Sequence, residues 1–83
     1  MTSNQLSENI KILLLKAKEY LNSNEKEKAL NIYDEVIKIE NENLEAHFNK
    51  ALILTKLQKY KEALRSYDLV IEIKPDFEEA YIN

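Results

Sequence analysis

Few side chains in this sequence are suited to catalysis or to metal binding. His47 is the only histidine and cysteine is absent, so one chain cannot supply a nucleophile with its base, or a metal site with two imidazoles. The adjacent acids Glu78 and Glu79 fit the first turn of a helix, where carboxylates face the positive end of the helix dipole. Glycine is also absent, which removes the usual phosphate-binding loop. We therefore predict no enzyme activity, no metal and no cofactor.

The composition of the chain limits the kinds of partner that it binds. Its 83 residues carry a net charge of −3, and the basic residues are interspersed with acids. Nucleic acids and anionic membranes require a clustered basic face, so we expect neither as a partner. The absence of cysteine is compatible with the cytoplasmic location that we predict. The apolar run from Ile10 to Leu15 is too short for a signal or membrane segment.

The chain repeats itself with a period of 34 residues. Residues 29–39 read ALNIYDEVIKI and residues 63–73 read ALRSYDLVIEI. The alanines, tyrosines and aliphatic residues recur at spacings of three and four, which is typical of an amphipathic helix that buries one face. A fixed period of this size indicates stacked supersecondary units that cannot bury their apolar faces alone.

The repeat resembles the tetratricopeptide repeat, a helix-turn-helix unit of 34 residues. In the second copy the small residues expected where the helices touch are Ala51 and Ala63, and Tyr60 and Tyr67 stand at aromatic positions. The closing proline is Pro75. The chain departs from the family pattern at His47, which replaces a tryptophan and which we interpret as a half-buried packing residue.

The resemblance implies an all-α fold of antiparallel helix-turn-helix hairpins, stacked as a short right-handed solenoid of two repeats plus the start of a third. We predict helices over residues 6–22, 25–40, 44–57 and 59–73, with a fifth beginning near Phe77. Capping boxes are expected at Asn24 with Glu27 and at Asp76 with Glu79. We predict one domain over residues 1–83, divided into a lead-in (1–11), a first repeat (12–45), a second repeat (46–79) and the start of a third (80–83).

The same resemblance implies that a peptide or helix of a partner protein binds on the concave face. First-helix positions line that face in the family, and the candidates here are Leu14, Lys18, Phe48, Asn49, Leu52 and Lys56. The family's two-carboxylate clamp for acidic chaperone tails is disfavoured, because Asn49 alone matches it and Glu79 would repel the ligand. Packing between repeats is the alternative interpretation of Phe48 and Leu52, which lie four residues apart.

Two other functions stay open at this stage. The chain is a homodimerising structural unit if its ends lack neighbours, since arrays normally need about three repeats. Leu64, Tyr67 and Ile71 are expected to leave apolar surface open at one end, and the run Ile12–Leu15 at the other. Alternatively, the chain is the repeat region of a larger co-chaperone or enzyme.

Overall fold

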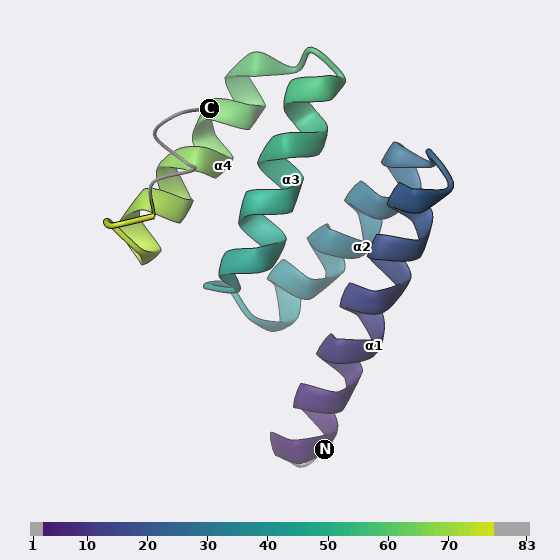
Figure 1. Ribbon diagram of the computed structural model, residues 1–83. Helices are drawn as coiled ribbons and strands as arrows, with labels where there is room; N and C mark the ends of the chain where they lie inside the picture. Colours follow the sequence, from purple (N-terminus) through teal and green to yellow (C-terminus); the bar gives the residue numbers. More distant parts are fainter. Residues whose placement is uncertain (1–2, 78–83) are drawn as a thin grey trace. The chain divides into compact units, whose positions relative to one another are not determined.

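The computed structural model describes residues 3–77 of the chain, and helices account for most of them (Figure 1). The helices are α1 (Ser3–Asn22), α2 (Lys26–Ile39), α3 (Leu44–Lys56) and α4 (Tyr60–Ile73). No strand occurs between residues 3 and 77. The predicted all-α class is confirmed, and α2, α3 and α4 begin and end within one residue of the predicted bounds. The fifth helix predicted near Phe77 lies outside the described residues.

The helices pack in consecutive antiparallel pairs. α1 packs along α2, and α3 packs along α4. The chain divides after Asn41 into two compact units, which we call the first hairpin (α1 and α2) and the second hairpin (α3 and α4). Each hairpin buries the apolar stripe of one helix against the next, as the 34-residue period predicts.

Each hairpin closes around a pair of alanines. Ala17 and Ala29 in the first hairpin have no exposed surface, and Ala51 and Ala63 in the second are 0% and 3% exposed. A methyl side chain lets two helix backbones approach closely, whereas a larger one would force them apart. The burial of all four alanines agrees with the prediction that small residues occupy the helix contacts. Beside them the buried ring of a tyrosine, Tyr33 or Tyr67, fills each core.

Both hairpin turns use the same backbone device without glycine. Asn24 and Gln58, 34 residues apart, adopt left-handed backbone angles, with φ of 60° and 63°. After α1, the amide of Asn24 donates to the carbonyl of Leu21 and that of Glu25 to the carbonyl of Tyr20. The amides of Gln58 and Lys59 make the equivalent bonds after α3. This is the Schellman pattern, which satisfies the last carbonyls of a helix and reverses the chain.

The predicted capping box at Asn24 and Glu27 is wrong. Asn24 is the left-handed residue that ends α1, and its Oδ1 accepts a hydrogen bond from Lys26 Nζ at 2.6 Å. The N-cap of α2 is Glu25, whose side chain makes no capping bond. Asparagine suits either position, because it both caps helices and tolerates left-handed angles better than other non-glycine residues. The turn geometry decided between the two roles.

A side-chain cap does occur at the start of α3, where it was not predicted. Asn43 Oδ1 accepts a hydrogen bond of 2.8 Å from the amide of Ala46. This bond satisfies one of the unpaired amides in the first turn. The second predicted capping box, at Asp76 and Glu79, extends beyond the described residues.

Replacement of Gln58 by glycine should stabilise the second hairpin. Glutamine in the left-handed region is strained by its Cβ, and relief of that strain exceeds the entropy that glycine adds to the unfolded chain. For Gln58→Gly we expect a gain of about 0.5–1 kcal/mol in the free energy of unfolding, measured by urea denaturation. Asn24→Gly is the matched control and should gain less, because asparagine is less strained there. A loss of stability in Gln58→Gly would contradict this account of the turn.

Candidate functional site

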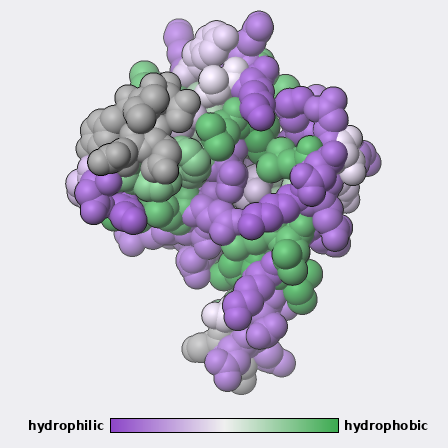
Figure 2. Space-filling view, in the orientation of Figure 1, coloured by the Kyte–Doolittle hydropathy of each residue, from purple (hydrophilic) through white to green (hydrophobic). Residues whose placement is uncertain are grey.

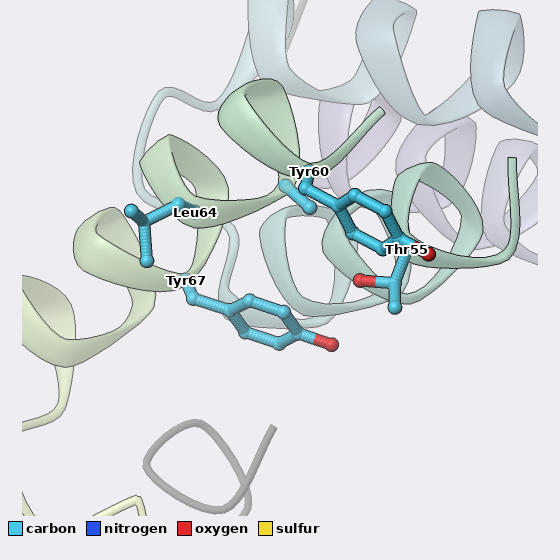
Figure 3. Close-up of a pocket in the computed structure, with 5 residues that line it drawn as sticks. Thr55, Tyr60, Leu64 and Tyr67 are labelled. Atoms are coloured by element: carbon cyan, nitrogen blue, oxygen red, sulfur yellow. The ribbon is translucent and has the colours of Figure 1, made fainter. Parts of the chain in front are cut away.

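An open hollow of about 310 Å³ lies on the second hairpin (Figure 3). Its walls are formed by Thr55 of α3 and by four residues of α4: Tyr60, Ala63, Leu64 and Tyr67. Ala63 and Tyr67 are buried, whereas Tyr60 and Leu64 are each 62% exposed. The buried pair forms the floor and the exposed pair forms the mouth. We call these five residues the hollow.

Aromatic contacts hold the floor of the hollow in place. The ring of Phe48 on α3 meets the ring of Tyr67 edge-on, with centroids 6.1 Å apart, and meets Phe77 with centroids 4.9 Å apart. Edge-to-face pairs of this kind are favourable beyond their buried area. Phe48 thus helps to fix Tyr67 against α3, and Figure 3 shows the Tyr60 and Tyr67 rings extending from α4 toward Thr55.

The hydroxyl of Tyr67 is buried and has no hydrogen-bond partner among the described residues. A buried polar atom without a partner reduces stability, and such atoms are uncommon in native proteins. Thr55, which α3 contributes to the lining, also carries a hydroxyl, and its Oγ1 donates to the carbonyl of Ala51 at 2.8 Å. The hollow therefore combines an apolar lining with one unused polar group on its floor.

Four exposed basic residues adjoin lining residues of the hollow in the chain, and we call them the basic rim. Lys56 follows Thr55 in the chain, Lys59 and Lys61 flank Tyr60, and Arg65 follows Leu64. Two exposed acids, Glu62 and Asp68, adjoin the lining in the same way, so four positive and two negative charges leave an excess of positive charge beside the hollow. None of the four basic side chains forms a hydrogen bond or an ion pair within residues 3–77. Lys59 is also the N-cap of α4 and makes no side-chain capping bond. The positive end of the α4 dipole therefore adds to the charge of the rim.

The first hairpin shows that the fold does not require this charge. The residues 34 positions before the basic rim are Asn22, Glu25, Glu27 and Asn31. Glu25 pairs with Lys28 at 2.9 Å, and this hydrogen bond raises the pKa of Lys28 above its usual value. At these equivalent positions the same backbone thus carries acids or asparagines in the first hairpin and bases in the second.

The structure places four of the predicted peptide-binding residues on α3. Phe48 and Leu52 are half-buried, one helical turn apart, and Lys56 is exposed and belongs to the basic rim. Asn49 donates from Nδ2 to the carbonyl of Glu45 at 2.9 Å. That bond lies within its own helix, so it gives Asn49 a structural role without any ligand.

The remaining two predicted residues lie on α1, in the first hairpin. Leu14 is half-buried and Lys18 is exposed. The grouping of all six residues on one concave face remains a prediction. The expectation that His47 is half-buried is wrong, because it is 5% exposed and belongs to the core of the second hairpin. Its position on α3, among the alanines of the close helix contact, accounts for the difference.

On the face shown in Figure 2, apolar side chains lie among hydrophilic ones. Leu64 is exposed, as predicted, whereas Tyr67 is buried and Ile71 is half-buried. On α1 the exposed members of the predicted apolar run are Ile12, at 55%, and Leu15, at 62%. Sequence reasoning did not recognise the hollow as a site. A comparison of the two repeats could have indicated it, because the second repeat has an aromatic residue, Tyr60, where the first has Lys26.

None of the helices between residues 3 and 77 is sufficiently long and apolar to cross a membrane. Among the same residues, histidine and acidic side chains do not gather into a group that would hold a metal ion.

Two consecutive helix-turn-helix hairpins with a period of 34 residues define a helical repeat protein. Family models described as tetratricopeptide repeat match residues 10–43 and residues 44–77. The chain belongs to the tetratricopeptide repeat family. Repeats of this family generally mediate protein–protein interactions and are typically non-catalytic. A search of curated proteins finds no match.

An acidic chaperone tail should bind this chain weakly. Of the residues that form the family's carboxylate clamp, Asn49 alone is present, and its amide is bonded to its own helix. We expect a dissociation constant no better than about 1 mM, equivalent to roughly −4 kcal/mol, in calorimetric titrations with a tail peptide. Asn49→Ala should leave the titration unchanged. Micromolar binding that Asn49→Ala abolishes would contradict this assignment.

Proposed function

We propose that this chain is a protein-interaction module that binds a peptide or helix of a partner protein on its concave face. The proposed contacts are Leu14, Lys18, Phe48, Asn49, Leu52 and Lys56. One observation carries the proposal: Phe48 and Leu52 lie one helical turn apart on α3 and are only half-buried, although the second hairpin has a buried core of its own. Exposed apolar surface of this kind typically marks a binding site. We further propose a cytoplasmic location and no catalytic activity.

The proposal predicts that truncation of Leu52 weakens partner capture. Leu52 is half-buried on α3 and does not support the aromatic floor as Phe48 does. With the intact protein as bait, Leu52→Ala should reduce recovery of partners by roughly tenfold, equivalent to about 1–2 kcal/mol. Recovery is measured by quantitative mass spectrometry.

The matched control is Ile39→Ala, which removes a similar side chain that is 45% exposed on α2. Circular dichroism melts of both variants establish that each is folded. If Ile39→Ala lowers recovery as much as Leu52→Ala, the loss is not specific to the α3 surface and the proposal is wrong.

Self-association is the second candidate function, and the apolar ends of the chain favour it. Ile12 and Leu15 are exposed on α1, and Leu64 is exposed on α4. Repeat stability is the sum of unit energies and neighbour interfaces, so open apolar faces gain from contact with another repeat. A second copy, or further repeats in a larger co-chaperone or enzyme, would provide that contact.

This candidate predicts a dimer at concentrations of tens of micromolar. Ile12→Glu with Leu15→Glu should shift it toward monomer, because both side chains are exposed and the charges would be buried in the interface. Sedimentation equilibrium measures the shift. A single species of 9.8 kDa in the unmodified protein would exclude self-association.

A further inference from the structure

We propose that the hollow and its basic rim bind an acidic amphipathic segment of a partner protein, with an apolar side chain seated between Tyr60 and Leu64. This inference rests on the proposed interaction function and extends it to a second surface. It names both the surface and the chemistry of the segment that binds there.

The shape and lining of the hollow select an apolar anchor. Its mouth is formed by Tyr60 and Leu64, which are largely exposed, and its floor by Ala63 and Tyr67, which are buried. Tyr60, Leu64 and Tyr67 cover about two turns of α4, a length of roughly 10 Å. A partner helix presents apolar residues at i, i+4 and i+7 over the same length.

The charge of the basic rim selects acidic flanks. Lys56, Lys59, Lys61 and Arg65 are exposed and form no ion pair within the described residues. Lys59 and Lys61 lie at the positive end of the α4 dipole, where bases reduce helix stability. Because the first hairpin has acids or asparagines at the equivalent positions, the repeat itself does not account for these bases. Acidic side chains on the partner would complement them.

The hydroxyl of Tyr67 adds a specific polar contact. It is buried, and no described residue bonds to it. A group on the bound segment would accept its hydrogen bond as side chains at the mouth move aside. In the free chain the left-handed Gln58 and the base at the N-cap of α4 both oppose stability at the turn between α3 and α4, whereas a buried tyrosine hydroxyl occurs in both repeats, at Tyr33 and Tyr67.

The test uses three fluorescein-labelled peptides of 15 residues and the full chain. The first peptide carries leucines at i, i+4 and i+7 with glutamates on both flanks. The second replaces the glutamates by lysines, and the third scrambles the first so that its apolar stripe is lost. By fluorescence anisotropy we expect the first peptide to bind, and to bind less tightly as salt is raised. We expect the other two to bind at least about tenfold more weakly, through lost charge pairing or a lost anchor.

Two substitutions separate a binding role from a structural one. Lys59→Asp supplies a better N-cap, so it should raise the urea midpoint while weakening the first peptide by roughly tenfold. Tyr67→Phe removes the buried hydroxyl, so it should also raise the midpoint while weakening binding by about fivefold. The control Lys16→Gln with Lys38→Gln, on the first hairpin, should leave binding within about twofold. Equal weakening by this control would mean that net charge, and not the rim, attracts the peptide.

Several results would overturn the inference. Equal binding of the scrambled peptide would exclude the hollow, and competition by an oligonucleotide of 15 thymidines would show a nucleic-acid site. A dimer that Lys59→Asp dissociates would identify a second copy as the occupant. Partner capture that depends on Leu52 but not on Lys59 would overturn this inference alone and leave the proposed function in place.

Discussion

The close approach of two helices at paired alanines is the constraint on which the rest of this structure depends. Ala17 with Ala29, and Ala51 with Ala63, have almost no exposed surface. A side chain as small as a methyl group lets the neighbouring backbones come close together. The buried tyrosine and valine side chains then fill the remaining space in the core. The close contact in turn requires a sharp reversal between the helices. A left-handed residue provides it in both hairpins, although the chain has no glycine.

The two hairpins share this backbone and differ in the side chains that surround the turn. In the first hairpin, the residue at the N-cap position of α2 is Glu25, which pairs with Lys28. In the second, the residue at the N-cap position of α4 is Lys59, and the side chains of the basic rim form no ion pair within the described residues. Residue types at the core positions therefore recur in both repeats, because both cores pack in the same way. Residue types at the exposed rim positions differ between the repeats, and they determine the charge of each hairpin's surface.

Two features at the turn of the second hairpin reduce its stability. Gln58 is strained, and Lys59 opposes the α4 dipole. Each is avoidable by a substitution that the backbone would accept. Binding surfaces commonly give up stability in this way, because exposed charge and apolar groups serve a partner better than they serve the fold. Membership of the tetratricopeptide repeat family establishes the helical scaffold. The side chains at the turn of the second hairpin differ from those of the first hairpin and give this part of the chain a different surface.

The sequence by itself determined the four helices, the 34-residue period, and the alanine contacts, because each follows from the spacing of residue types along the chain. It did not determine which role Asn24 plays, since helix caps and left-handed turns both accept asparagine, and the geometry of the turn decided. The sequence also led us to predict a half-buried His47, which is buried in the structure. The basic residues of the second repeat were not recognised from the sequence as neighbours of a hollow. Only the tertiary structure brings Thr55 of α3 beside Tyr60, Leu64 and Tyr67 of α4. A hollow exists between helices, so the periodicity within either helix cannot reveal it.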